Sequence, residues 1–191
     1  MDINAVNDSL SFALRRLDEL KRINNGNISS AQPQERQILI QEFFFHLVSA
    51  IDKLAQVINQ SRTLNIPINQ VSYPQICRRL RQTDPIRPLI ALLHPETQHN
   101  RQWVPLPQNP YSEESSHFRI LVFRHWVNHT GVNPFHFRWG AEPNTSLVLD
   151  PRDRSLGASK LAAMDELESF WNLVNDKCEQ VIGILSSIGV I

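Results

Sequence analysis

The sequence has few cysteines and no long apolar run, and these two absences exclude several classes of protein. Cys77 and Cys178 are its only cysteines, and neither belongs to a CxxC motif. A zinc site built from thiolates is therefore excluded, and a disulfide-rich scaffold is not expected. No apolar stretch approaches the roughly 18 to 20 residues that a membrane-spanning helix needs. We expect a protein without a membrane segment, with two reduced thiols in or near its core.

The sequence also lacks an excess of charge of either sign. Its 19 lysine and arginine residues equal its 19 aspartate and glutamate residues. Such a balance provides no overall positive field that would attract nucleic acid, so binding of that kind needs a local patch. The first residues contain neither the basic nor the apolar region of a signal peptide. We therefore expect a cytoplasmic location.

The length and the apolar pattern predict one all-α domain over residues 1–191. A chain of 191 residues, 41% of them hydrophobic, suits a single core. Apolar residues recur at alternating spacings of three and four over 3–24, 34–63 and 156–187, which is typical of amphipathic helices. Shorter helical elements are predicted near 73–82 and 84–93, and a further helix over 112–130. The predicted fold class is a helical bundle of four to five main helices.

Two of these predicted helices indicate what surrounds them. The three consecutive phenylalanines at 43–45 cannot all point one way on a helix, so we expect the second helix to be covered on more than one side and central to the bundle. The last helix has a regular apolar stripe that suits a seam within the bundle or a seam between two chains equally well. The stripe consists of Met164, Leu167, Trp171, Val174, Cys178, Val181, Leu185 and Ile188.

Three further segments leave alternatives open. The segment 95–111 is rich in Gln, Asn and Pro and is predicted to be a long loop of the kind that serves as a lid, a flap or a partner-binding loop. The segment 135–149 is either a small hairpin or extended coil. Arg78, Arg79 and Arg81 form the densest basic cluster, either a solvated helix face or a phosphate-facing patch.

The most unusual polar cluster consists of Arg124, His125, Asn128 and His129, in the last two turns of the predicted helix 112–130. Residues four apart share a helix face, so the two histidines lie on one side and Arg124 with Asn128 on the neighbouring side. Arginine offers a fixed fork of donors to a phosphate, and histidine can move a proton near neutral pH. Together they could cleave RNA without a metal. The histidine would act on the 2′-hydroxyl or on the leaving oxygen, and the arginine would stabilise charge on the phosphate.

The run Arg124-His-Trp-Val-Asn-His129, late in a helix of a predicted bundle, resembles the signature of the HEPN superfamily. The resemblance implies a four- to five-helix bundle, usually a homodimer, with a metal-independent endoribonuclease site shared by both protomers. It implies that Arg124 binds phosphate, that His129 transfers protons and that His125 fills the polar position beside the arginine. It also implies a role as a toxin or in phage defence, with RNA as substrate and an antitoxin or a nucleotidyltransferase as partner.

Two departures from that signature keep other interpretations open. His125 stands where asparagine is most common, and Thr130-Gly131 replaces a tyrosine that often follows the histidine. A metal site could use His125 and His129 with His117 or His136, although the glutamate of HExxH is missing. In a purely structural interpretation Arg124 and Asn128 cap or bridge neighbouring helices, and His125 and His129 form hydrogen bonds at the loop 131–147. The protein would then be a non-catalytic interaction protein. Our preferred hypothesis remains a metal-independent endoribonuclease or an RNA- or nucleotide-binding relative, with no metal and no cofactor.

Overall fold

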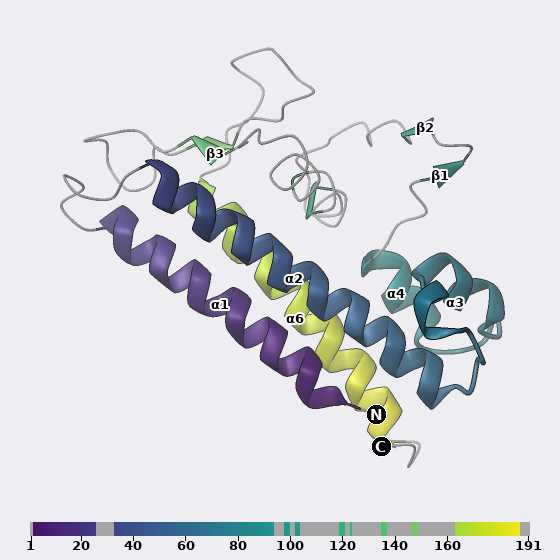
Figure 1. The fold of residues 1–191 in the computed structure, drawn as a ribbon. Helices are drawn as coiled ribbons and strands as arrows, with labels where there is room; N and C mark the ends of the chain where they lie inside the picture. The colour runs from purple at the N-terminus through teal and green to yellow at the C-terminus, as the bar shows by residue number, and fades with distance from the viewer. Residues whose placement is uncertain are drawn as a thin grey trace.

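Three long amphipathic segments form the three long helices of the structure, a computed structural model. It describes residues 2–25, 33–93 and 163–187, with short pieces at 98–99, 102–103, 119–120, 123, 135–136 and 147–148. Helix α1 (Ile3–Asn25) runs antiparallel to α2 (Pro33–Ser61) and to α6 (Ala163–Ser187), and the chain ends lie at the same end of the bundle (Figure 1). The all-α class and these three predicted helices are confirmed. The start predicted for the last helix, at 156, lies outside the described residues.

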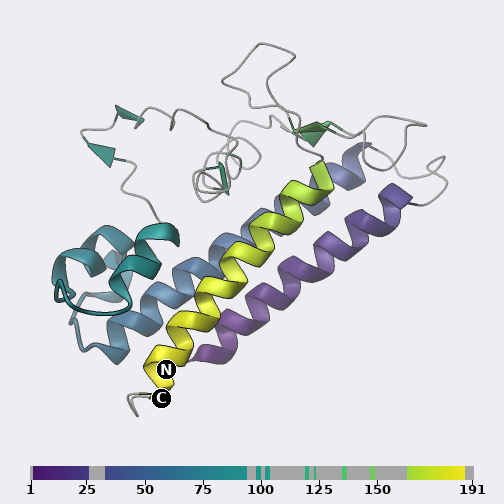
Figure 2. The ribbon, with the colours of Figure 1, turned by 180° about the vertical axis from the view of Figure 1, so that it is seen from behind.

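Two short helices form a lobe beside the end of α2. Helix α3 (Tyr73–Arg79), helix α4 (Arg87–Leu93) and a 3-10 turn, η1 (Ile68–Gln70), make up most of this α3–α4 lobe, which we define as residues 62–93 (Figures 1 and 2). The hydroxyl of the buried Tyr73 donates a hydrogen bond to the carbonyl oxygen of Ile51 on α2. The side chain of Asn59 both donates to Ile66 O, at 2.8 Å, and accepts from Ile66 N, at 3.1 Å. These bonds hold the lobe against α2.

The triple phenylalanine of α2 is only partly covered. Phe43 and Phe44 are fully buried, whereas Phe45 is 62% exposed. The prediction that α2 is central to the bundle is confirmed, because it packs against α1, α3 and α6. This coverage does not extend to Phe45. Successive helical residues point about 100° apart, and the third ring falls outside the arc that the neighbouring helices cover.

This arrangement predicts opposite outcomes for two adjacent substitutions. Phe44→Ala is expected to lower the free energy of unfolding by about 3–5 kcal/mol, because it removes a buried ring and leaves a cavity. Phe45→Ala, the matched control on the same helix, should change the free energy of unfolding of the monomer by less than about 1 kcal/mol. Urea denaturation followed by circular dichroism measures both. Equal losses for the two variants would contradict this packing.

The apolar stripe of α6 lies inside the bundle of a single chain. Met164, Leu167, Val174, Cys178, Val181 and Leu185 are all buried there. Trp171 is half-buried, and its indole nitrogen donates to Leu10 O on α1 at 3.1 Å. Ile188 lies outside the described residues. Of the two alternatives for this stripe, the structure therefore selects the seam within the bundle.

Both cysteines are free, as expected. Cys178 is buried and Cys77 is half-buried. Burial raises the pKa of Cys178 to about 12, so its thiol stays protonated and unreactive at neutral pH. Within the part of the chain that the structure describes, no helix has the length and apolar character needed to cross a membrane.

Two very short antiparallel strand pairs accompany the helices. Strand β1 (Gln98–His99) pairs with β2 (Gln102–Trp103), so the segment predicted to be a loop over 95–111 contains a small hairpin. Strand β3 (Phe135–His136) pairs with β4 (Leu147–Val148). This second pair selects the hairpin over extended coil for segment 135–149.

Candidate functional site

The predicted catalytic residues Arg124, His125, Asn128 and His129 lie outside the described residues, so their arrangement stays a prediction. The described positions nearest to them are Arg119, Ile120 and Phe123, which are helical and buried. They confirm the middle of the predicted helix 112–130. The candidate cluster thus begins one residue after a core side chain.

Phe123 is anchored by an aromatic column through the bundle. Its ring centroid lies 5.9 Å from that of Phe170 on α6, with the two planes tilted by 54°. Phe170 in turn lies 6.1 Å from Phe44 on α2, again centroid to centroid. Tilted rings at such separations are favourable aromatic pairs. The column ties the segment that precedes Arg124 to two long helices.

A buried ion pair adds a second anchor on the same segment. Arg119 and Glu166 are only 2% and 3% exposed, and Arg119 donates from Nε to Oε1 and from Nη2 to Oε2, the latter at 3.1 Å. The guanidinium carbon of Arg119 also lies 5.8 Å from the centroid of the Phe170 ring. Burial raises the pKa of Glu166, and the hydrogen bond and charge of Arg119 oppose this effect. Because two parallel hydrogen bonds have a defined geometry, the pair also fixes the orientation of Arg119 against α6.

Sequence reasoning missed this ion pair. The available signal was an arginine inside the apolar run Phe118-Arg-Ile-Leu-Val-Phe123, together with a glutamate directly before Leu167 of the apolar stripe. Charged residues at positions that face a core are rarely buried unless they are paired. Two such residues in one chain therefore indicate each other as partners.

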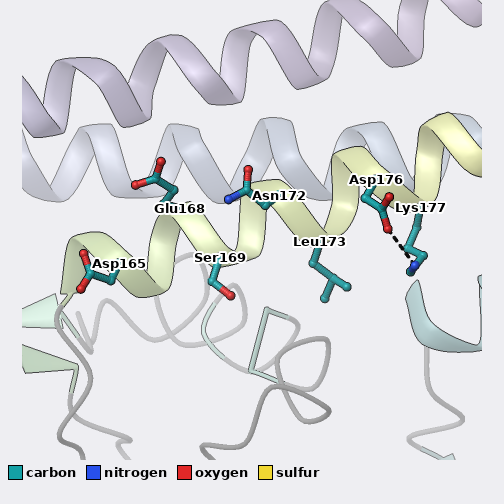
Figure 3. A pocket seen from close by; sticks show the side chains of 7 residues that line it. All are labelled: Asp165, Glu168, Ser169, Asn172, Leu173, Asp176 and Lys177. Carbon is teal, nitrogen blue, oxygen red and sulfur yellow. Dashed lines mark hydrogen bonds and ion pairs between the residues drawn. The ribbon is translucent and has the colours of Figure 1, made fainter.

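A hollow of about 600 Å³ lies along the outward side of α6 (Figure 3). Three carboxylates and one lysine are the charged groups of its described lining, and two of the carboxylates have basic partners. Glu168 lies 2.9 Å from Lys21 Nζ, and Asp176 lies 2.7 Å from Lys177 Nζ, which lowers the pKa of Asp176. The described lining consists of Asp165, Glu168, Ser169, Asn172, Leu173, Asp176 and Lys177. Since its charge is mostly negative, this hollow does not suit a phosphate.

A groove of about 500 Å³ follows the contact between α1 and α6. Its lining includes Leu10, Leu14, Trp171 and Ile182, and among its described residues only Glu179 is charged. The described lining of this groove has no basic group for a phosphate either. Neither hollow therefore competes with the Arg124–His129 segment as a phosphate site.

The proposed histidine ligands of a metal cannot be compared with the described structure, because their side chains lie outside it. Within residues 2–25, 33–93, 163–187 and the short pieces, no group of three or more His, Cys, Asp or Glu side chains could hold a metal ion. His117, His125 and His129 lie outside these ranges, and only the backbone of His136 is described. The metal alternative stays a hypothesis about those histidines.

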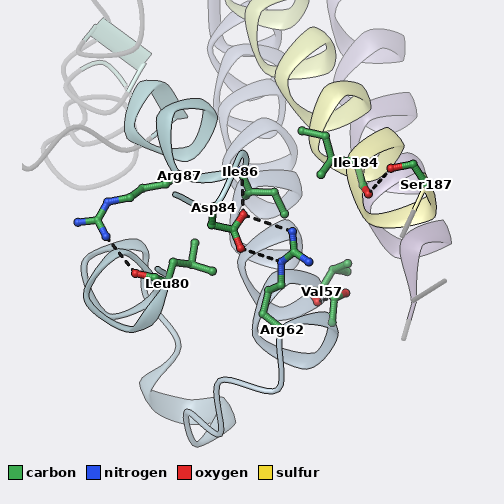
Figure 4. Close-up of polar contacts among 9 residues, drawn as sticks. Val57, Arg62, Leu80, Asp84, Ile86, Arg87, Ile184 and Ser187 are labelled. Atoms are coloured by element: carbon green, nitrogen blue, oxygen red, sulfur yellow. Dashed lines mark hydrogen bonds and ion pairs between the residues drawn. The ribbon is translucent and has the colours of Figure 1, made fainter. Parts of the chain in front are cut away.

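The positive charge of the described structure gathers in the α3–α4 lobe. Arg79 Nη1 donates to Leu64 O at 2.8 Å. Arg87 Nη1 donates to Leu80 O at 3.0 Å, as Figure 4 shows. Arg62 pairs instead with Asp84, with 3.1 Å between Nε and Oδ2. The lobe therefore contains Arg87 in addition to Arg78, Arg79 and Arg81, the basic cluster of the sequence.

Comparison with protein-family models, with curated proteins and with solved structures gives no match to this chain. The resemblance to the HEPN superfamily accordingly rests on the six residues from Arg124 to His129. The helical bundle is compatible with it and does not establish it, since many unrelated proteins share bundle architecture.

Proposed function

We propose that the protein is a metal-independent endoribonuclease of HEPN type, or an RNA- or nucleotide-binding relative, acting in the cytoplasm. The observation that carries the proposal is the five-residue spacing of Arg124 and His129, which begins one residue after the buried Phe123 of an all-helical bundle. A core residue directly before Arg124 supports the proposal, because catalytic groups need a rigid support.

In the proposed reaction the 2′-oxygen of RNA attacks the adjacent phosphorus and the bond to the 5′-oxygen breaks. The proton leaves the 2′-hydroxyl, and a proton is delivered to the departing 5′-oxygen. His129 carries out one of these transfers, because imidazole exchanges protons near neutral pH. Arg124 binds the phosphate oxygens and stabilises the charge that develops on them. His125 and Asn128 orient the phosphate beside them.

The proposed biological setting follows from the same resemblance. A homodimer would complete the site with the same residues of a second copy. A toxin or phage-defence role would require an antitoxin or a nucleotidyltransferase as partner to control the activity. Incubation of the purified protein with RNA in EDTA tests the reaction itself.

The second candidate function is a non-catalytic helical interaction protein. A specific observation favours it: Phe12 on α1 and Ile38 and Phe45 on α2 are all exposed. Ile38 and Phe45 are seven residues apart, which places them two turns apart on the same side of α2. His46 links the helices by stacking on Phe12, with 5.2 Å between ring centroids. Partial burial, helped by nearby cationic side chains, lowers the pKa of His46, so this ring is neutral at physiological pH.

We expect this face of α1 and α2, and not the buried stripe of α6, to pack against a second copy of the chain. Phe45→Ser should convert a dimer into a monomer, because it removes the most exposed ring of the face. Light scattering coupled to size exclusion measures the mass of both forms, with Ser186→Ala on α6 as the control. A monomeric unsubstituted protein would contradict the interaction function and the shared ribonuclease site alike.

A further inference from the structure

The α3–α4 lobe is strongly basic, although the chain as a whole has no net charge. Residues 62–93 contain five arginines and a single acid, Asp84, which leaves a formal excess of four positive charges. Helix α6 has the opposite bias, with five acids and one lysine. The arginines are Arg62, Arg78, Arg79, Arg81 and Arg87. Such separation of charge creates the local positive field that the balanced composition does not provide.

Most of these arginines have no carboxylate partner among the described residues. Within the described structure only Arg62 is paired with a carboxylate, that of Asp84, which also accepts a bond from Ile86 N at 3.0 Å (Figure 4). Arg79 and Arg87 donate to backbone carbonyls instead. A carbonyl fixes the position of a guanidinium without neutralising it, and a guanidinium has five N–H donors, most of which remain for a ligand.

Helix stability explains only part of the cluster. Arg78 and Arg79 lie in the last turn of α3, where the helix dipole favours cations. Arg81 follows the helix, and Arg87 is the first residue of α4, where the dipole disfavours a cation. The side chain of Arg87 nevertheless reaches back to the carbonyl of Leu80, the residue between Arg79 and Arg81. The fold thus concentrates guanidinium groups where local stability does not require them.

We infer that the surface formed by Arg78, Arg79, Arg81 and Arg87 binds the phosphate backbone of single-stranded RNA. The choice of RNA among polyanions rests on the proposed function. Guanidinium forks match phosphate oxygens, and such contacts hold a strand without reading its sequence. A membrane surface fits less well, because the lobe has only one large exposed apolar side chain among its described residues, Ile68, and membrane-surface helices need a continuous apolar face.

Binding of a labelled single-stranded RNA, measured by fluorescence anisotropy over a series of salt concentrations, tests this inference. The measurement uses His129→Ala as background, so that the RNA stays intact while Arg124 keeps its charge. Adding Arg78→Gln and Arg81→Gln is expected to weaken binding at least tenfold at low salt. Each lost phosphate contact should reduce the slope of log K against log salt by about 0.7, so about 1.4 in total. Neither arginine makes a hydrogen bond or ion pair with another described residue, so the fold should persist.

The matched control replaces Arg15 and Arg22 of α1 by glutamine in the same background. Both are exposed, and their removal changes the net charge equally but leaves the lobe intact. An equal loss in the two double variants would overturn the inference, and so would an unchanged slope in Arg78→Gln/Arg81→Gln. Binding to phosphatidylserine vesicles without binding to RNA would overturn it as well. RNA binding that depends on the lobe, in a protein that never cleaves RNA, would support the inference while contradicting the nuclease.

Discussion

Replacement of Arg124 or His129 by alanine is expected to reduce the rate of RNA cleavage in EDTA at least 100-fold. A positioned general acid or base contributes roughly 10²–10⁴ to a rate, and loss of a group that stabilises transition-state charge costs about 10²–10³. The two single variants should be nearly as impaired as the double variant, because groups that act together are strongly non-additive. His125→Ala and Asn128→Ala should cause smaller losses, since these residues only orient the phosphate.

Rates of cleavage are measured by gel electrophoresis under single-turnover conditions, with circular dichroism as a check of folding. Arg22→Ala removes an exposed arginine of α1 that belongs to neither proposed site, and it should retain full activity. Unchanged cleavage in Arg124→Ala and His129→Ala would assign the activity to another site or to a contaminant. Loss of cleavage on adding EDTA would instead favour the metal alternative, which elemental analysis of the purified protein tests separately.

Breaking the buried ion pair is expected to destabilise the fold more than any surface substitution. Arg119→Met leaves the carboxylate of Glu166 buried without its partner, and Glu166→Leu does the same to the guanidinium. Removal of one member of a buried pair costs about 3–5 kcal/mol in free energy of unfolding. The double variant Arg119→Met/Glu166→Leu should recover most of that loss, because similar apolar side chains fill the same space without a buried charge.

Urea denaturation of the four proteins forms a double-mutant cycle for this pair. Glu168→Gln supplies the control, since Glu168 lies on the same helix two residues later and pairs with Lys21 near the surface. That substitution should cost less than about 1 kcal/mol. Losses that simply add in the double variant would show that the two side chains contribute independently, contrary to their bidentate contact.

The long helices were predictable because their pattern is local. The three-four spacing of Val6, Leu10, Ala13, Leu17 and Leu20 places them on one side of α1 whatever the rest of the chain does, and all are buried. The stripe of α6 was equally clear. The surface that this stripe packs against was not predictable, since a seam within one chain and a seam between two chains require the same spacing.

Features that depend on neighbours were not predictable. The exposure of Phe45 depends on how far α1 and α6 extend around α2, which spacing along α2 does not encode. Arg119 and Glu166 are 47 residues apart, and each alone would be assigned to the surface by its charge. Arg87 joins the basic cluster through a contact with Leu80 O that only the turn between α3 and α4 creates. The Arg124–His129 hypothesis came from residue types and spacing, and it stays a prediction.

The chemistry of RNA cleavage in EDTA tests the central claim most directly. The claim requires the 2′-hydroxyl as nucleophile, so an RNA with a single 2′-deoxy substitution should resist cleavage at that position alone. The fragments from unmodified RNA should end in a 2′,3′-cyclic phosphate and begin with a 5′-hydroxyl, as mass spectrometry would show. Cleavage at the deoxy position, fragments that begin with a 5′-phosphate, or intact RNA would contradict a metal-independent site built on Arg124 and His129.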